Sequence, residues 1–241
     1  MELSGNVTII TGASMGIGLS TARVFAQAGA KLALVARSVD KLEALANELR
    51  AQGHEPLVIP TDMRNRDAIH AMVVKAFDHF GRIDILINNA GQAAAGQVAT
   101  VNPEHYQQII ELNLFGPLHA IQAVVPKMRQ SGGGLIINVS SMVSKMSIPG
   151  LGTYASTKAA LNMLSDTARG ELAPDNIRVI TVYPRLTTTN FGRNSLGDER
   201  MRQQQRTGAP AAPRPPADSA EHVANRILLA AQTEPKEQFM D

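Results

Sequence analysis

Hydrophobic and polar positions follow two alternating patterns along most of the chain. Short apolar runs predict buried strands, and longer segments with apolar residues three or four apart predict helices. The expected strands are Val7–Thr11, Leu32–Ala36, Leu57–Ile59, Ile83–Asn88, Leu135–Val139 and Ile177–Val182. The expected helices are residues 17–28, Lys41–Arg50, Ala68–Phe80, Pro103–Arg129 and Tyr154–Leu172. Fully apolar strands separated by helices are typical of a parallel sheet covered on both faces, so we expect one doubly wound α/β domain over residues 1–241.

The pattern changes after Pro184. Residues 185–218 contain six arginines and four prolines and show little apolar periodicity. A segment of this length without regular structure is typical of a mobile lid over a site, and we place that lid at about residues 187–217. Asp218 can then cap a last helix through Val223 and Leu228, and Lys236–Met240 has room for a short final strand.

Composition excludes several classes of function. The 241 residues carry a formal net charge of +2, so no general affinity for nucleic acid is expected. The chain has no cysteine, which excludes disulfides, thiolate metal sites and a cysteine nucleophile. The six histidines are scattered, and we expect no metal site. Without a basic leader before a long apolar core, or an apolar run of about 18 residues, the chain is expected to be cytoplasmic with no membrane partner.

A glycine-rich turn follows the first predicted strand, in the pattern T-G-x-x-x-G-x-G at Thr11–Gly18. Glycines let the backbone approach a pyrophosphate closely, and the N-terminus of the next helix supplies free N–H groups. The pattern alone also fits an ordinary turn between a strand and a helix. Its position between the first strand and the first helix favours a dinucleotide site.

The end of the second predicted strand indicates which dinucleotide is preferred. A site that prefers NAD usually offers a carboxylate there to the ribose 2′-hydroxyl, but this chain has Arg37. Arg37 can pair with a 2′-phosphate, and the Ser14 hydroxyl can add a hydrogen bond. Met15 adds no second positive charge, and Arg37 could instead be a solvated residue before the next helix. We expect NADP(H) in preference to NAD(H).

Tyr154 and Lys158 are four residues apart, which on a helix puts the phenol and the ammonium group on one face. Opposite charges about 5 Å apart at an effective dielectric constant of about 20 interact by roughly 3 kcal/mol. This would bring the pKa of the phenol well below its ordinary value of about 10, into the range of a general acid or base.

Two serines follow the fifth predicted strand, at the edge of the sheet where doubly wound folds place their ligands. Either Ser140 or Ser141 could donate a hydrogen bond to a substrate carbonyl oxygen. A serine at this place could equally cap the turn that follows the strand.

Taken in order, five motifs resemble those of the short-chain dehydrogenase/reductase family. They are T-G-x-x-x-G-x-G at Thr11–Gly18, Asn88-Asn89-Ala90-Gly91, Asn113, Ser141 and Tyr154-x-x-x-Lys158. The resemblance extends from Gly5 to about Thr189. It implies a Rossmann-type sheet with strand order 3-2-1-4-5-6-7 and hydride transfer between a nicotinamide and a carbonyl or an alcohol.

The resemblance also implies a role for each matching residue. Tyr154 would donate the proton, and Ser141 would orient the carbonyl, with Ser140 as the alternative. Lys158 would hold the nicotinamide ribose and lower the pKa of the tyrosine, and Asn113 would keep a water in the proton relay. The expected cofactor site consists of Gly12, Ser14, Met15, Gly16, Ile17, Gly18, Arg37, Asp62, Met63, Asn89, Ala90, Gly91, Tyr154, Lys158, Pro184, Thr187 and Thr189.

The match breaks at Arg185, where the family usually has glycine after proline. The backbone there loses access to positive φ, and a cation is expected near the cofactor. The short chain after Gln232 also departs from the family, whose members often form dimers or tetramers; we expect a homodimer or homotetramer.

These residues predict an NADP-dependent enzyme that reduces a small or medium, mostly apolar ketone or oxidises a secondary alcohol. Residues 142–151 could line an apolar pocket or pack under the lid. One alternative substrate is a 3-oxoacyl thioester, for which Lys127, Arg129 or the arginine-rich segment could steer an acidic carrier. A different alternative is a nucleotide-sensing protein that has lost turnover, with Arg185 as its mark.

Overall fold

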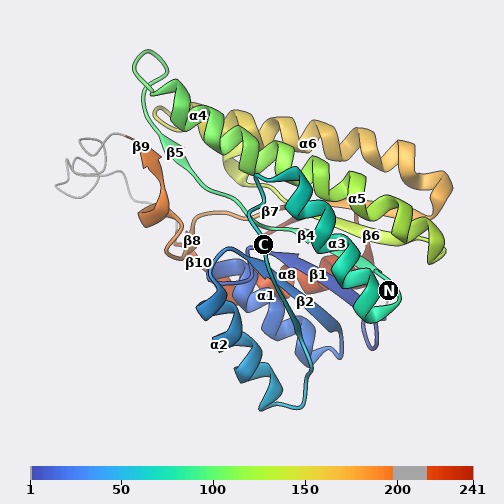
Figure 1. The fold of residues 1–241 in the computed structure, drawn as a ribbon. Coiled ribbons are helices and arrows are strands. Elements are labelled where there is room, and N and C mark those ends of the chain that lie inside the picture. Colours follow the sequence, from blue (N-terminus) through green and yellow to red (C-terminus); the bar gives the residue numbers. More distant parts are fainter. Residues whose placement is uncertain (1, 198–215, 241) are drawn as a thin grey trace.

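Seven parallel strands form the central sheet of the computed structural model, which describes residues 2–197 and 216–240 (Figure 1). The strands are β1 (Val7–Thr11), β2 (Lys31–Ala36), β3 (Leu57–Pro60), β4 (Ile85–Asn88), β6 (Gly134–Val139), β7 (Ile177–Tyr183) and β11 (Glu237–Phe239). They lie in the order β11-β7-β6-β4-β1-β2-β3, and every pair is parallel. Counted along the chain within this sheet, the order is 3-2-1-4-5-6-7, which confirms the predicted fold.

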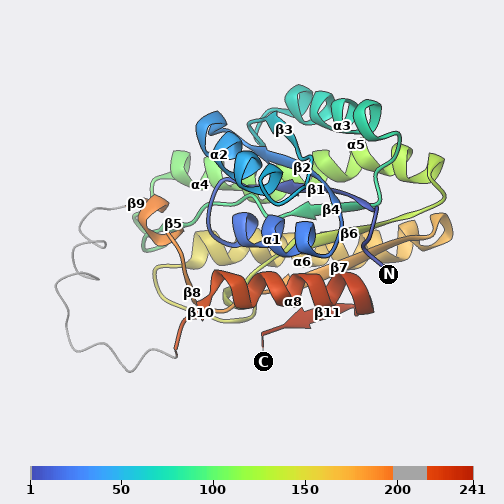
Figure 2. The same ribbon diagram turned by 90° about the horizontal axis from the view of Figure 1, so that it is seen from below.

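Helices cover both faces of the sheet. The helices α1 (Gly16–Gln27), α2 (Val39–Arg50) and α8 (Ala220–Thr233) pack on one face, and α1 lies beside α8 (Figure 2). On the other face lie α3 (Arg66–Phe80), α4 (Pro103–Ile110), α5 (Gly116–Gln130) and α6 (Gly152–Leu172). This layering follows from the sequence, because each crossover between parallel strands lays a helix against the sheet.

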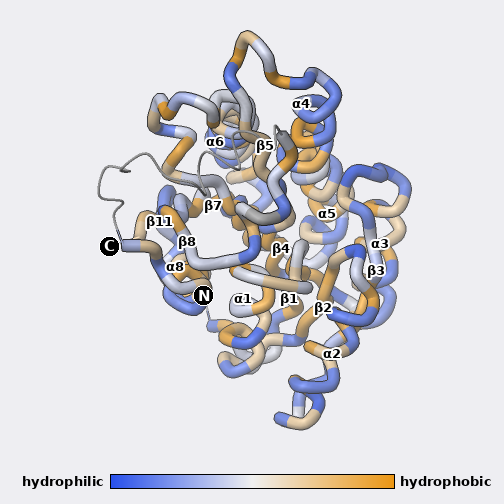
Figure 3. Tube along the Cα trace, turned by 90° about the vertical axis from the view of Figure 1, so that its left-hand side faces the viewer, coloured by the Kyte–Doolittle hydropathy of each residue, from blue (hydrophilic) through white to orange (hydrophobic). Residues whose placement is uncertain are grey.

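The core consists of two apolar clusters, one on each face of the sheet. One includes Phe25 of α1 and Ile227 of α8, and the other includes Ile69 of α3 and Val124 of α5; all four are fully buried. Every residue of β1 is buried. Hydrophobic residues line the strands and the inner sides of the helices (Figure 3). Burial on both faces explains why most residues of the central strands are apolar.

The helix predicted over Pro103–Arg129 contains one turn of π-helix, η1 (Glu111–Phe115), between α4 and α5. The Gly116 N–H bonds to the Glu111 carbonyl five residues back, and Pro117 has no N–H to donate to Asn113. Among the described residues, Pro103–Gln130 is the one stretch long and apolar enough to span a membrane. In this fold it is a layer helix, with 44% of its most apolar window buried.

Short elements complete the structure at the ends of the main strands. Two small parallel pairs join β5 (Ala94–Ala95) to β9 (Leu196–Gly197), and β8 (Thr187–Thr188) to β10 (Asp218–Ser219). Short 3-10 turns are η2 (Met142–Lys145), η3 (Ala173–Asp175) and η4 (Gly192–Asn194). Of the predicted lid, residues 198–215 lie outside the described residues. Residues 187–197 contain short strands and a turn that pack against the rest of the chain.

The predicted cap of the last helix is wrong by one residue. The N-cap of α8 is Ser219, whose hydroxyl accepts a hydrogen bond from the His222 N–H at 3.0 Å. The Asp218 carboxylate is held instead by Arg185, at 3.0 and 3.2 Å. The predicted final strand is confirmed as β11, which adds to the edge of β7.

Candidate active site

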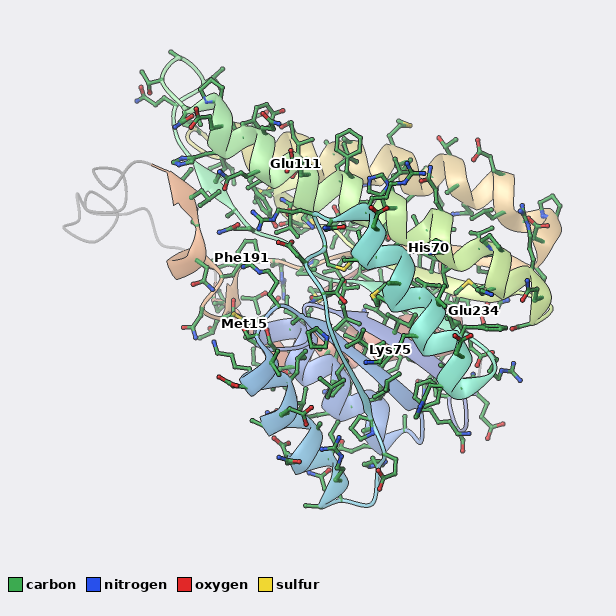
Figure 4. All side chains as sticks on the ribbon, viewed as in Figure 1. Met15, His70, Lys75, Glu111, Phe191 and Glu234 are labelled. Atoms are coloured by element: carbon green, nitrogen blue, oxygen red, sulfur yellow. The ribbon has the colours of Figure 1, made fainter. Side chains whose placement is uncertain are left out.

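The candidate residues gather at one edge of the sheet because all seven strands run in the same direction. Their carboxyl ends therefore meet there, with the turns that follow them. Met15 at the start of α1 and Phe191 in the segment after β8 both lie on this side of the molecule (Figure 4). Glu234, which follows α8, lies on the opposite side.

Two positions in the turn after β1, Gly12 and Gly18, have no room for a side chain. Gly12 has φ +70°, and a Cβ atom there would lie 2.9 Å from Asn89 Nδ2. A Cβ on Gly18 would lie only 2.3 Å from the Gly12 carbonyl oxygen. The turn is held from the neighbouring strand, since Thr11 Oγ1 accepts the N–H groups of Asn89 and Ala90, both at 3.0 Å. The first glycine turn and the turn after β4 therefore form one rigid unit.

The N-terminus of α1 is suited to an anion. Met15 at the N-cap of α1 makes no side-chain hydrogen bond to the helix within the described structure, as is also the case at the N-caps of α2, α5 and α6. The first N–H groups of α1 are therefore free of a side-chain cap, at its positive dipole end. A cleft of about 430 Å³ runs beside them, lined by Gly16, Leu19, Ser20, Thr188, Thr189, Asn190 and Ala220. The residues present fit a dinucleotide whose pyrophosphate lies at this turn.

The residues expected at the adenosine end lie where β1, β2 and β3 end. Arg37 is exposed directly after β2, and the Ala13 N–H bonds to Val35 O at 3.0 Å, which brings the Ser14 turn beside β2. Asp62 follows β3 and pairs with Arg64 at 2.6 Å. This hydrogen bond lowers the pKa of Asp62, and the charge of Arg37 adds to the effect.

Two of the expected cofactor residues have apolar side chains that serve packing. Met63 is 4% exposed and belongs to the core cluster formed by α3 and α5. Ile17 packs partly against the core between α1 and α8. Any contact of these two residues with a dinucleotide is therefore left to their backbone.

Tyr154 and Lys158 lie together on α6, and both are buried, with 8% and 4% exposure. The Lys158 ammonium donates a hydrogen bond to Val139 O at the end of β6, at 2.8 Å. A Cβ on Gly91 would lie 3.5 Å from Lys158 Nζ and 3.2 Å from Asn113 Oδ1, so these three residues are immediate neighbours. The structure thus brings the tyrosine, the lysine, the asparagine and the turn after β4 into one group.

The two candidate serines are distinguished by their partners. Ser141 is partly exposed and lies beside Tyr154, and its Oγ also caps η2 by accepting the Val143 N–H at 3.4 Å. Ser140 is 3% exposed, and its hydroxyl donates to Asn162 Oδ1 at 2.5 Å. This geometry favours Ser141 over Ser140 as the serine that faces a substrate.

Asn113 lies in the π-helical turn η1 and is fully buried. Its Oδ1 accepts the Gln92 N–H, and its Nδ2 donates to Gln92 O, both at 2.9 Å. The Nδ2 also donates to Thr157 Oγ1 at 3.1 Å. The side-chain amide therefore fixes the chain after Gly91 beside Lys158, and the expected water of a proton relay stays a prediction.

The pKa of Tyr154 is shifted upward and not downward, and the cause is burial. Burial raises the pKa of Tyr154 to about 12, and a hydrogen bond with Ser141 only partly opposes it. Burial also lowers the pKa of Lys158 to about 8. Desolvation disfavours the charged form of each side chain, so it raises the pKa of the phenol and lowers that of the ammonium group. An estimate from charge separation alone omits this cost.

The departure at Arg185 is accommodated without strain. Among the described non-glycine residues, positive φ occurs only at Asn176 and Glu234, so the backbone at Arg185 needs no glycine. The Arg185 guanidinium pairs in a bidentate manner with Asp218, whose side chain is 11% exposed. The cation expected near the cofactor is thus offset by a carboxylate, and the pair joins the start of β8 to the start of α8.

The segment after Arg185 folds over the site. A Cβ on Gly16 would lie 3.2 Å from Thr189 Cγ2. Thr187 lies in β8, two residues before Thr189. The Phe191 ring lies 5.6 Å from the Tyr154 ring. Pro184 O accepts the Met142 N–H at 2.9 Å, which ties the end of β7 to the chain after Ser141.

Sequence reasoning did not find four of these residues: Gln92, Thr157, Asn162 and Phe191. Asn162 is one helical turn beyond Lys158, so the spacing that identified Tyr154 and Lys158 could have identified it. Phe191 lies in a segment without periodicity, and the chain there carries no such signal.

Comparison with known proteins identifies the family. The model of short chain dehydrogenases matches residues 6–200. The chain belongs to the short-chain dehydrogenase family. It is 35% identical over 198 residues to the mouse dehydrogenase/reductase SDR family member 7B, covering 80% of this chain and 61% of the mouse protein. The chain thus spans about three fifths of that relative's length.

Solved structures of short-chain dehydrogenases share the whole fold. The L-sorbose reductase of Gluconobacter frateurii, in complex with NADPH and L-sorbose, is 32% identical, with a TM-score of 0.86 over 100% of this chain and 97% of that one. The 3-ketoacyl-(acyl-carrier-protein) reductase of Brucella melitensis, in complex with NADH, is 26% identical, with a TM-score of 0.85 over 99% and 98%. An oxidoreductase with a nicotinamide dinucleotide cofactor is therefore supported.

Replacing Lys158 with Met tests the cost of the buried ammonium group. The pKa of Lys158 is about 8 in the folded chain, below its ordinary 10.5, so the charged form destabilises the fold below about pH 8. K158M should raise the free energy of unfolding by on the order of 2 kcal/mol at pH 7, as measured by urea denaturation. The gain should fade between about pH 8 and 10.5, because the wild-type lysine then folds uncharged. A less stable variant at pH 7, or a gain that does not change with pH, would contradict this origin.

Proposed function

We propose that the protein is an NADP(H)-dependent carbonyl reductase or alcohol dehydrogenase that acts on a small or medium, mostly apolar ketone or secondary alcohol. The observation that carries this proposal is the placement of the buried Tyr154 hydroxyl beside Ser141 and one helical turn from the buried Lys158, at the sheet edge that also holds the glycine turn. A proton donor thus lies beside a hydrogen-bond donor for a carbonyl oxygen.

In the reducing direction, the carbonyl oxygen is held by Ser141 while Tyr154 donates its phenolic proton to it. When bound at the glycine turn and Lys158, a reduced nicotinamide dinucleotide would supply the hydride for the carbonyl carbon. The high pKa of Tyr154 keeps the phenol protonated before the reaction, as a general acid requires. Lys158, whose pKa is about 8, can exchange a proton near neutral pH and so restore the tyrosine, and we assign Asn113 to the same relay.

The residues proposed to hold the dinucleotide lie along the path from the glycine turn to Lys158. The backbone of residues 12–18 would bind the pyrophosphate, and Asp62 and Met63 the adenine. Residues 89–91 and Lys158 would bind the nicotinamide ribose. Pro184, Thr187 and Thr189 would border the nicotinamide.

The preference for NADP(H) rests on Arg37. Its exposed guanidinium follows β2, beside the turn that carries Ser14, and no carboxylate stands at the end of β2 to favour the 2′-hydroxyl of NAD. Similar solved structures contain either dinucleotide, NADPH in the L-sorbose reductase and NADH in the Brucella reductase, so the proposed preference rests on Arg37 alone.

An apolar substrate is favoured by the side chains around the site. Two segments come close to the start of α6: a Cβ on Gly152 would lie 3.3 Å from Val98 Cγ2, and the Phe191 ring lies 5.6 Å from the Tyr154 ring. These segments and their neighbours carry large apolar side chains that remain at least one third exposed: Val98, Met146, Ile148, Leu186 and Phe191. Such a rim favours a hydrophobic ketone over a polar one.

The thioester alternative has less support. Lys127 and Arg129 lie in the last turn of α5, at the opposite edge of the sheet from Tyr154. Arg129 is paired with Asp175 at 2.6 Å, and Lys127 lies over the Phe77 ring. The sensor alternative rests on Arg185 in place of the usual glycine. Since Arg185 pairs with Asp218 and its backbone does not need positive φ, the substitution gives no reason to expect a loss of turnover.

Oxidation of NADPH in the presence of a panel of ketones, 3-oxoacyl thioesters and polyol ketones tests the proposal. We expect the highest kcat/KM with apolar ketones. Tyr154→Phe should lower kcat by about 10³-fold with unchanged affinity for NADPH, because the proton donor is lost. Tyr106→Phe is the matched control. The Tyr106 hydroxyl is hydrogen-bonded to Ser156, an exposed residue of α6. Cofactor binding without turnover of any carbonyl would favour the sensor.

Replacing Arg37 with Asp tests the preference for NADP(H). We expect the ratio of kcat/KM for NADPH to that for NADH to fall by about 10²-fold, because a charge-assisted pair becomes a repulsion. Lys31→Asp is the control, since Lys31 is an exposed cation at the other end of β2. An unchanged ratio in R37D would mean that another residue contacts the 2′-phosphate.

We also propose that the protein is a homodimer or a homotetramer. Phe115 and Met163, 44% and 68% exposed, lie on neighbouring helical segments, and Leu229 and Phe239 form a second exposed pair on α8 and β11. Sedimentation velocity should show a dimer or tetramer that the double substitution F115K/M163K dissociates to smaller species. A wild-type monomer at all concentrations would contradict the proposal.

A further inference from the structure

The face of α6 that carries the proposed catalytic pair extends one turn further. Tyr154, Lys158 and Asn162 follow each other at intervals of four residues, which places them in a row along the helix. The first two reach the end of β6 and the segment after it. Asn162 is partly buried and lies beside the same segment.

The Asn162 amide contacts the chain on both sides of Ser141. Its Oδ1 accepts the Ser140 hydroxyl at 2.5 Å, and its Nδ2 donates to Ser144 Oγ at 2.9 Å. The Ser144 hydroxyl in turn donates to Ser141 O at 2.6 Å. Ser141 is therefore enclosed by a closed set of hydrogen bonds that begins and ends on one side chain of α6.

The position between Ser140 and Ser144 requires one acceptor and one donor, and the Asn162 amide provides both. Ser140 is 3% exposed, so its hydroxyl requires a partner within the protein. Ser144 uses its own proton for the Ser141 carbonyl, so its oxygen requires a donor. Asparagine supplies both functions from one short side chain, whereas aspartate would supply acceptors only.

We propose that Asn162 is a positioning residue that fixes the Ser141 hydroxyl relative to Tyr154. The inference rests on the proposed function, because Ser141 is there the group that orients the carbonyl. Asn162 itself contacts Ser140 and Ser144 and acts on the reaction through the backbone of Ser141. Displacing a hydrogen-bond donor in an active site by about 0.5–1 Å lowers the rate substantially. A residue that holds Ser141 in place therefore affects kcat.

The next polar residue along the helix provides a matched control. Ser165 is fully buried and accepts a hydrogen bond from Asn138 Nδ2 at 2.8 Å. Asn138 in turn accepts one from Asn88 of β4 at 2.9 Å. This second network joins α6 to the strands without contacting Ser141. Ser165→Ala therefore removes a buried hydrogen bond from the same helix with no direct path to the serine.

A double-mutant cycle tests the proposal. The kcat for the best ketone would be measured for the wild type, S141A, N162A and S141A/N162A, together with the Kd for NADPH. N162A should lower kcat about tenfold with unchanged Kd, from the loss of hydrogen bonds that hold Ser141. In the S141A background the further loss should be less than about twofold, because the residue that Asn162 positions is gone. S165A should have the same effect in both backgrounds.

A spectroscopic readout keeps the inference separate from the proposed function. The ¹³Cζ resonance of Tyr154, assigned with Tyr154→Phe, reports the surroundings of its hydroxyl, beside which Ser141 lies. It should move in N162A toward its position in S141A and not move further in the double variant. This result would support the inference even if no carbonyl is reduced by the wild type. A resonance unmoved in N162A, or losses of kcat that simply multiply in the double variant, would overturn it.

Asn162→Asp is the variant to use if N162A does not fold, because its size is nearly unchanged. The carboxylate can accept from both Ser140 and Ser144, so Ser144 would no longer donate to Ser141 O. N162D should therefore lose kcat about tenfold and displace the Tyr154 resonance. Wild-type kcat together with a wild-type resonance in N162D would contradict the proposed positioning.

Discussion

The account depends on one arrangement, a phenol and an ammonium group buried together where the parallel strands end. Lys158 donates a hydrogen bond to the carbonyl of Val139 at the end of β6, and Tyr154 lies beside Ser141 just beyond it. Burial disfavours the charged form of both side chains, so the fold carries a cost for keeping them there. Surrounding elements support this pair: η1 places Asn113 beside the lysine, and Thr11 ties the turn after β4 to the glycine turn.

The same arrangement explains why segments distant in the sequence meet. The end of β7 is tied to the chain after Ser141, and Arg185 joins β8 to the first residues before α8. Since α8 packs beside α1, the segment that covers Tyr154 and the helix that begins at the glycine turn are held in one body. A dinucleotide lying along this edge would contact all of these elements together, which agrees with the family to which the chain belongs.

Most of the fold could be predicted from the sequence because it depends on local patterns. Strands buried on both faces are mostly apolar, apolar residues recur every three or four positions in the helices, and the order of the sheet follows from the resemblance to the family. The residues of the site could be named because their spacing along a helix or after a strand is regular. Features that depend on distant partners could not be predicted. Gly116 lies against the backbone of Met63 in the region of the π-helical turn, Arg185 finds Asp218 across 33 residues, and the pKa of Tyr154 is set by burial.

The most direct test of the central claim is a crystal structure of the protein with NADP⁺ bound. The account predicts that the pyrophosphate lies on the first turn of α1, that the 2′-phosphate contacts Arg37, and that the nicotinamide ring lies beside the Tyr154 hydroxyl and Lys158. A dinucleotide bound away from the turn at residues 12–18, or a nicotinamide remote from Tyr154, would contradict it.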